Sequence, residues 1–164
     1  MEPENLRISE VIMPETVELD LQGISDKDGI IRHLIEMLFA AGKIRSEEDF
    51  ARAIYKRESE ASTYMEHFIA IPHAKSESVI QAGIAFARIR DGVMYQTPFG
   101  GGIAKLIFML AIPDQMSADA YINVLALLAR LLVHEEFRNA LYEVEDFNGL
   151  IKAIHEGEAL LIED

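Results

Sequence analysis

The feature that most constrains the fold is a near-continuous apolar run late in the chain, KLIFMLAIP, residues 105–113. It is far shorter than the roughly 20 residues of a membrane-spanning helix, and Pro113 ends it. A continuous apolar run of this length is typical of a strand that is covered on both faces. The rest of the chain must therefore supply layers for both faces of a sheet.

Segments with helical periodicity alternate with the predicted strands. Each begins with a residue that favours a helix N-terminus, and apolar side chains then recur at a spacing of three or four residues. We expect helices that are capped at Ser25, Ser46 and Ser117, followed by two shorter helices around 137–141 and 147–154.

Further strands are predicted by alternation and by turn residues. TVELDLQ (16–22) is expected as the first strand, FIAI (68–71) as a short buried strand and QAGIAFARI (81–89) as a longer one. RDG (90–92) is a turn signal, and TPFGGG (97–102) is expected to be a flexible loop. Strands interleaved with helices predict an α/β fold, a three-layer α-β-α sandwich, in one domain that covers residues 1–164.

The composition excludes several classes of function. Fifteen basic and 28 acidic residues give a net charge of −13, which disfavours nucleic-acid binding and favours a basic partner. Without cysteine there is no disulfide, thiol nucleophile or thiolate metal site. The N-terminal sequence lacks the pattern of a signal peptide, so we expect a cytoplasmic protein without direct membrane insertion.

A histidine follows the short strand at once, in IAIPH. Pro72 has no N–H group and a fixed φ, so we expect it to end the strand and to place His73 beyond its carboxyl end. A neutral imidazole offers one lone pair at neutral pH and can attack phosphorus. Arg57 is suited to phosphate oxygens, and Thr63 is among the nearby hydroxyls. Without this context, His73 would be interpreted as an ordinary loop or core residue.

The segment KRESEASTYMEHFIAIPHAKSESV (56–79) resembles the active-site segment of the enzyme IIA component of the mannitol/fructose type, the type-2 EIIA domain of the phosphoenolpyruvate-dependent sugar phosphotransferase system. The match has no gap between Arg57 and His73, and the resemblance extends over about 19–154. Ile-Pro-His alone would not be specific, whereas the combination is.

The resemblance implies a phosphoryl carrier with a mixed sheet of about five strands and helices on both faces. His73 would be the catalytic residue, accepting a phosphoryl group from phospho-HPr and passing it to a IIB component, which serves a membrane IIC component. Arg57, Thr63 and Tyr121 would support the phosphoryl group. The resemblance implies neither a metal nor a nucleotide cofactor, and the other histidines show no metal-binding spacing.

Two positions depart from the family pattern. Relatives commonly carry a second histidine where this chain has Tyr121, which can donate a hydrogen bond but adds no positive charge. Relatives also tend to have glycine at Glu66 and a small residue at Phe68, and an acid near the site would repel a phosphoryl group. These departures leave two alternatives open: a regulatory EIIA-like binding module whose phosphorylation state controls a partner protein, and a purely structural domain.

Overall fold

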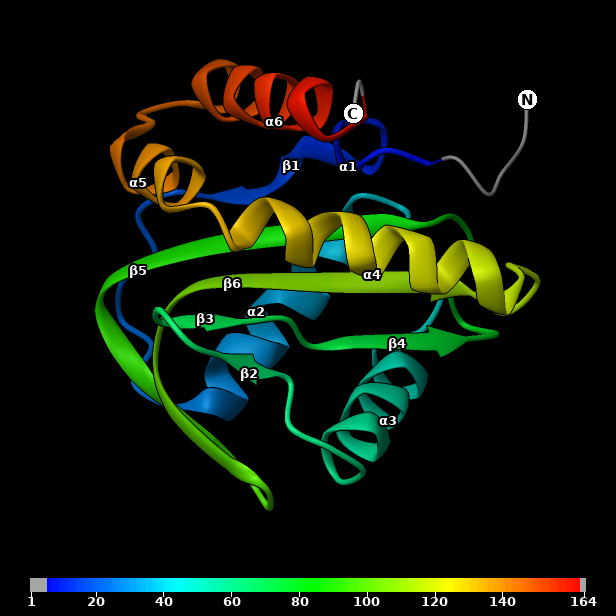
Figure 1. The fold of residues 1–164 in the computed structure, drawn as a ribbon. Helices are drawn as coiled ribbons and strands as arrows, with labels where there is room; N and C mark the ends of the chain where they lie inside the picture. Colours follow the sequence, from blue (N-terminus) through cyan, green and yellow to red (C-terminus); the bar gives the residue numbers. More distant parts are fainter. Residues whose placement is uncertain (1–5, 163–164) are drawn as a thin grey trace. The chain divides into compact units, whose positions relative to one another are not determined.

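The computed structural model describes residues 6–162, and this part of the chain forms a six-stranded mixed sheet with helices (Figure 1). The strands are β1 (Ile12–Glu18), β2 (Tyr64–Met65), β3 (Ile69–Ala70), β4 (His73–Ser76), β5 (Gly83–Thr97) and β6 (Gly100–Pro113). The helices are α1 (Ile8–Val11), α2 (Lys27–Ala40), α3 (Glu47–Glu58), α4 (Ala118–Leu132), α5 (Glu135–Glu143) and α6 (Phe147–Ile162). The predicted α/β fold with a mixed sheet is confirmed, with six strands where about five were expected.

The central strand of the sheet is β6, which contains the apolar run found in the sequence. The strand order is β1-β5-β6-β3-β2, and β4 also pairs with β6. β5 is antiparallel to β6, whereas β3 and β4 are parallel to it. Residues 106–111 are all fully buried, as expected of a strand that is covered on both faces.

The contacts divide the chain into two compact units. One unit contains residues 15–115, with most of the sheet and the helices α2 and α3. The other contains residues up to Pro14 and from Met116 onwards, where α1, α4, α5 and α6 pack against one another. The unit with residues 15–115 contains His73, Arg57 and Thr63.

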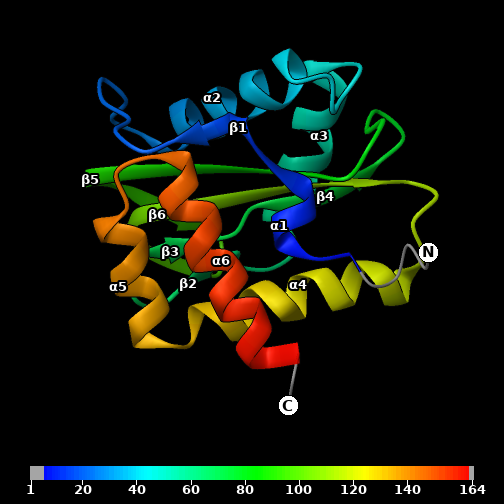
Figure 2. The same cartoon turned by 90° about the horizontal axis from the view of Figure 1, so that it is seen from above.

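Helices α2 and α3 lie side by side on one face of the sheet (Figure 2). α3 begins after Ser46, whose hydroxyl accepts a hydrogen bond from the N–H of Asp49, and α4 begins in the same way after Ser117. The prediction of Ser25 as the cap of α2 is wrong, because the carboxylate of Asp26 accepts the N–H of Gly29. The last helix, α6, is longer than predicted.

The first strand lies earlier in the sequence than predicted. β1 ends at Glu18, and its fully buried Thr16 donates a hydrogen bond to the carbonyl of Ile84 at 2.8 Å. The alternation in 16–22 continues past the strand because Leu21 is also buried, in a segment that is held by Arg88 rather than by sheet pairing.

Two predicted interruptions are parts of one long hairpin. RDG is not a turn: β5 continues through it with a register shift between Arg88 and Val93. Gly92 has a φ of 77°, and a Cβ there would come within 2.5 Å of a methyl carbon of Ile103. TPFGGG is not a flexible loop, because its glycines begin β6 and pair with β5 across a turn closed by Thr97 and Gly100.

Candidate functional site around His73

His73 is the first residue of β4, and this position corrects the expectation that it lies beyond the end of a strand. β3 pairs with β6 at Ile69 opposite Leu106, and β4 pairs with β6 at His73 opposite Leu110. The difference in residue number between the partners is the same in both pairs, so β3 and β4 continue one register along β6. They are therefore one parallel strand that is interrupted at Ile71 and Pro72. The prediction that Pro72 stops the strand is right for β3 only, since the strand resumes at the next residue.

The interruption is fully hydrogen bonded through its backbone. The N–H of Ile71 donates to the carbonyl of Thr63 at 2.9 Å, and the carbonyl of Pro72 accepts the N–H of Leu110 at 3.0 Å. Pro72 has no N–H group that would need a partner. The two residues before His73 are therefore held on both sides, by the loop at Thr63 and by β6.

The imidazole of His73 bends back onto this interruption. Its Nδ1 lies 2.7 Å from the carbonyl oxygen of Ile71. A backbone carbonyl can only accept a hydrogen bond, so Nδ1 carries the proton and the lone pair of the neutral ring is on Nε2. The side chain is 5% exposed, and burial is the main cause that lowers its pKa below the ordinary value for histidine. The ring is thus held as a neutral base with one defined nucleophilic atom.

Arg57 lies in the last turn of α3, where a cation is favoured by the helix dipole. Its Nη1 donates to the carbonyl of Ala61 at 3.1 Å, and the side chain is half-buried. The positive charge of Arg57 also lowers the pKa of His73, whereas the charge of Glu58 raises it. The charge of Arg57 thus acts on His73, while the part of both residues in a phosphoryl site stays a prediction.

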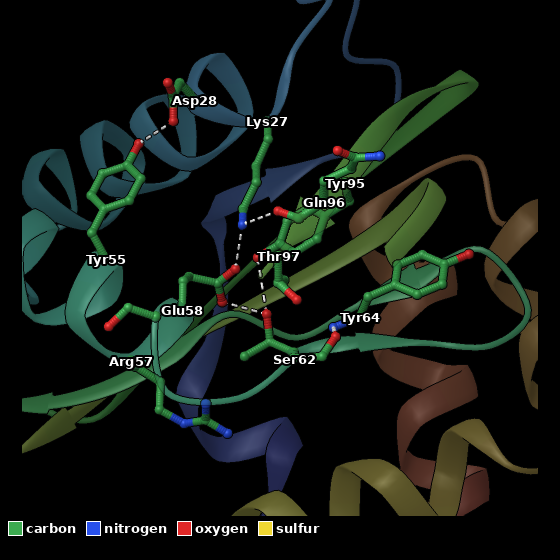
Figure 3. A network of polar contacts seen from close by, with 12 residues as sticks. Lys27, Asp28, Tyr55, Arg57, Glu58, Ser62, Tyr64, Tyr95, Gln96 and Thr97 are labelled. Atoms are coloured by element: carbon green, nitrogen blue, oxygen red, sulfur yellow. Dashed lines mark hydrogen bonds and ion pairs between the residues drawn. The ribbon is translucent and has the colours of Figure 1, made fainter. Parts of the chain in front are cut away.

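Thr63 belongs to a buried polar cluster that we call the Glu58 network, formed by Lys27, Glu58, Thr63 and Tyr95. Lys27 Nζ lies 2.7 Å from Glu58 Oε1 and donates to the carbonyl of Gln96 at 2.6 Å (Figure 3). The hydroxyl of Thr63 donates to Glu58 Oε2, so the Tyr95 hydroxyl, 3.1 Å away, donates to Thr63. Burial raises the pKa of Tyr95, which keeps this donor protonated.

Sequence reasoning missed Lys27, Glu58 and Tyr95 as parts of the site. One signal was available for Glu58, because the buried face of α3 consists of Phe50, Ile54 and Glu58 at intervals of four residues. A carboxylate at such a position requires a buried partner. No comparable signal marked Lys27 and Tyr95, which come from α2 and β5.

The other candidate residues are not part of the Glu58 network. Ser62 accepts the N–H of Tyr64, and Ser76 bonds to Ser78, so both hydroxyls have local structural partners. Glu66 is exposed in the turn between β2 and β3. Tyr121 lies in the first turn of α4, in the other compact unit, and its part in the site stays a prediction.

Comparison with known proteins identifies the family. The chain belongs to the family described as "Phosphoenolpyruvate-dependent sugar phosphotransferase system, EIIA 2", whose model matches residues 10–157. A fructose-specific EIIA component of Haloferax volcanii is 33% identical over 138 residues, which are 84% of this chain and 88% of that protein. A fructose-specific EIIABC component of Bacillus subtilis is 35% identical over 151 residues, 92% of this chain but only 23% of that larger protein. The family expected from the sequence is confirmed.

Solved structures of similar proteins have the same fold. The nitrogen regulatory protein IIA-Ntr of Neisseria meningitidis has a TM-score of 0.79 and 26% identity over 90% of this chain and 98% of its own. Enzyme IIA mannitol of Escherichia coli, solved in a complex with phosphorylated enzyme IIB mannitol, has a TM-score of 0.71 and 21% identity over 89% of this chain and 99% of its own. Within residues 6–162, no helix is both long and apolar enough to cross a lipid bilayer.

Proposed function

We propose that the protein is a phosphoryl carrier that accepts a phosphoryl group from phospho-HPr on His73 and passes it to a IIB component for sugar uptake. The observation that carries this proposal is the hydrogen bond from Nδ1 of His73 to the carbonyl of Ile71. It leaves the lone pair on Nε2, the atom that can attack phosphorus. Membership of the EIIA family supports a role as a component of the phosphotransferase system.

The transfer is a displacement at phosphorus between two imidazoles. Nε2 of His73 forms a bond to phosphorus as the phosphorus–nitrogen bond of the donor breaks, and the donor ring keeps the electron pair. The Nδ1 proton stays on the bond to Ile71, so His73 needs no separate base. In the second step a nucleophile of IIB attacks the same phosphorus and His73 leaves with its lone pair restored.

Positive charge and hydrogen-bond donors must meet the phosphoryl oxygens, because stabilisation of this charge accounts for most of the catalysis of phosphoryl transfer. We assign Arg57 this role, since its charge already acts on His73. Tyr121 would add a phenol donor at the position where relatives have histidine. The hydroxyl of Thr63 has buried partners, so we give Thr63 a positioning role, while its direct contact with phosphate stays a prediction.

IIB as the acceptor is supported by the Escherichia coli neighbour that was solved with phosphorylated IIB. Mannitol and fructose proteins both occur among the relatives, so sugar choice would be made by the IIB and membrane IIC components. Such a carrier would work in the cytoplasm, where phospho-HPr is made.

The proposal is tested by incubating the protein with phosphoenolpyruvate, enzyme I and HPr, followed by mass spectrometry under non-acidic conditions. We expect one acid-labile phosphate on the wild type and on the control His134→Ala, which changes an exposed histidine. His73→Ala should gain none. Equal phosphate on His73→Ala and wild type would contradict the assignment of the nucleophile.

A regulatory role is the second candidate, favoured by the likeness to nitrogen regulatory protein IIA-Ntr. In that case His73 would still be phosphorylated, but the phosphate would control binding to a partner protein. Transfer from the phosphorylated protein to a purified fructose-type or mannitol-type IIB separates the two functions. Rapid loss of the phosphate to IIB supports the carrier, whereas retention of the phosphate supports the regulatory module.

A further inference from the structure

The Glu58 network places two charged side chains and two hydroxyls in the interior, where apolar side chains could also pack the helices together. Glu58 is 4% exposed and Thr63 3% exposed, and the network joins the start of α2, the end of α3 and strand β5. A buried ion pair is weak evidence for stability, because the cost of removing both charges from water can exceed their attraction. We therefore ask which other residues the Glu58 network holds in place.

An unbroken series of hydrogen bonds leads from this network to His73. The carboxylate of Glu58 accepts the hydroxyl of Thr63, and the Thr63 carbonyl accepts the N–H of Ile71 at 2.9 Å. The carbonyl of Ile71 accepts Nδ1 of His73 at 2.7 Å. Thr63 is thus the residue through which the buried carboxylate is connected to the imidazole.

The loop that contains Thr63 is anchored on one side of this residue by the pairing of β2 with β3 and at Thr63 itself by its side chain. Between α3 and β2 the described side-chain bonds are local: Arg57 to the carbonyl of Ala61, and the hydroxyl of Ser62 to the N–H of Tyr64. Among the described side-chain bonds of this loop, the one from the hydroxyl of Thr63 leads to the interior, through Glu58 and Tyr95. The Thr63 carbonyl is therefore held from two sides, by the side-chain bond to Glu58 and by the pairing of β2 with β3 that begins at the next residue.

We propose that Glu58 and Thr63 are positioning residues for phosphoryl transfer: the buried carboxylate holds Thr63, Thr63 holds Ile71, and Ile71 selects the His73 tautomer whose lone pair is on Nε2. The inference rests on the proposed function in that His73 is taken as the nucleophile. Neither residue needs to touch the phosphoryl group. Lys27 orients Glu58 through their ion pair, and Tyr95 completes the bonding of the Thr63 hydroxyl.

The test uses Thr63→Val, which keeps the shape of the side chain and removes the hydroxyl, beside Thr63→Ser, which restores a hydroxyl. The matched control is Thr16→Val in β1, because Thr16 is fully buried in the same unit and its hydroxyl also donates one bond, to the carbonyl of Ile84. Tyr95→Phe is a milder second variant in case Thr63→Val does not fold.

The first measurement is the tautomer of His73, from nitrogen-15 spectra of the imidazole at a pH where the ring is neutral. We expect the wild type, Thr63→Ser and Thr16→Val to have the proton on Nδ1. Thr63→Val should show a mixture that includes the other tautomer, and Tyr95→Phe a smaller change in the same direction. The rate of phosphoryl acceptance should fall about tenfold in Thr63→Val, the effect of losing one hydrogen bond from the positioned state.

An unchanged tautomer in folded Thr63→Val would overturn the inference. So would an equal change in Thr16→Val, because the effect would then follow from lost stability alone. The tautomer is read without any donor protein, so it tests the positioning role even if phospho-HPr does not modify His73. Failure of phosphorylation with an intact tautomer would overturn the proposed function and leave the hydrogen-bond series standing.

Discussion

Glu58 occupies a position in α3 where the helical repeat predicts an apolar side chain, after Phe50 and Ile54. Burying an ionised carboxylate costs several kcal/mol unless it is paired and hydrogen bonded. Lys27 supplies the opposite charge at 2.7 Å, and its side chain is itself largely buried. Either charge without the other would therefore destabilise the folded protein.

Replacing one member of this pair should lower the free energy of unfolding. We expect Lys27→Met to lower the free energy of unfolding by about 3 kcal/mol at pH 7, because it leaves a buried carboxylate without its cation. Denaturant unfolding measures the change. The control is Lys43→Met, which removes a half-buried lysine whose long bond to Gln81 is exposed to solvent, and it should change stability by no more than about 0.5 kcal/mol. Similar losses in both variants would contradict this account of the pair.

The lowered pKa of His73 has consequences for rate and for stability. We expect phosphoryl acceptance to stay level as the pH falls from 8 to about 6.5, the ordinary pKa of histidine, because the folded protein keeps the neutral ring. Below about pH 6.5 the unfolded chain binds the proton first, so His73 makes the free energy of unfolding decrease as the pH falls towards the folded pKa. An NMR titration of His73 and unfolding curves at several pH values measure both effects.

A comparison with His73→Ala isolates the contribution of this one group. The variant should lose the part of the pH dependence that lies just below 6.5. If the titration instead gave His73 a pKa above the ordinary value, the burial argument would be wrong.

Arg57 is predicted to act through the planar fork of its guanidinium. Arg57→Lys keeps the charge but loses paired bonds to phosphate oxygens, so we expect the rate of phosphoryl acceptance to fall about tenfold or more. Stability should change by less than about 1 kcal/mol, since the half-buried side chain makes one bond, to the carbonyl of Ala61. Stopped reactions with phospho-HPr give the rate. A full rate in Arg57→Lys would show that a point charge is enough.

Among the site residues, the sequence indicated those whose chemistry is carried by a local motif. His73, Arg57 and Thr63 lie within 56–79, and their part in the site was predicted from that segment. Lys27 and Tyr95 could not be found in this way, since the pairs they form join residues that are far apart in the chain. The orientation of His73 was also out of reach, because it depends on the pairing of β4 with β6.

At the scale of elements, the turn between β2 and β3 is unusual. His67 and Phe68 both have a φ of 66°, in the left-handed region that favours glycine. Lys105 lies over the Phe68 ring at 4.8 Å, and the Phe68 carbonyl accepts two N–H groups of β6, which holds the turn against this strain. The turn leads directly into β3.

Relief of this strain should stabilise the protein. We expect His67→Gly to raise the free energy of unfolding by about 0.5 kcal/mol, the gain from removing a left-handed side chain less the added freedom of glycine in the unfolded chain. Thermal unfolding provides the comparison. Glu66→Gly, at a neighbouring position without a positive φ, should lower stability instead. Changes of the same sign in both variants would rule out the strain argument.

Element prediction succeeded where one periodicity extended over a whole segment. The apolar run of β6 and the capped starts of α3 and α4 are examples. It failed at β1, where Leu21 is buried outside the sheet, and in β5, where Asp91 and Gly92 form part of an irregular stretch of strand. Turn residues and bulge residues have the same composition, so local sequence does not separate them.

At the scale of the whole molecule, the net charge of −13 favours encounter with a basic partner surface. We expect phosphoryl transfer from a donor with a basic docking face to slow several-fold when the ionic strength is raised from 0.05 to 0.5 M, because salt screens this attraction. Transfer rates at low protein concentration measure the effect. The reaction of His73 with a small phosphoryl donor such as phosphoramidate is the control, and it should depend much less on salt.

The family and the α/β fold followed from the sequence over most of its length, because the motif and the pattern of elements agree. The two compact units were not anticipated, since no linker or change of composition marks Pro14 or Met116. That residues 1–164 act as one domain stays a prediction.

β3 and β4 pair with β6 in the same register, so the residue that lies at the site depends on the number of residues between Ala70 and His73. Each step along one strand is matched by a step along its partner, so the pairing of Ile69 with Leu106 already determines which residue lies opposite Leu110. A chain shortened by one residue between Ala70 and His73 would present the methyl group of Ala74 there. The residue opposite Leu110, His73, is therefore specified by the number of residues in this segment as well as by their chemistry.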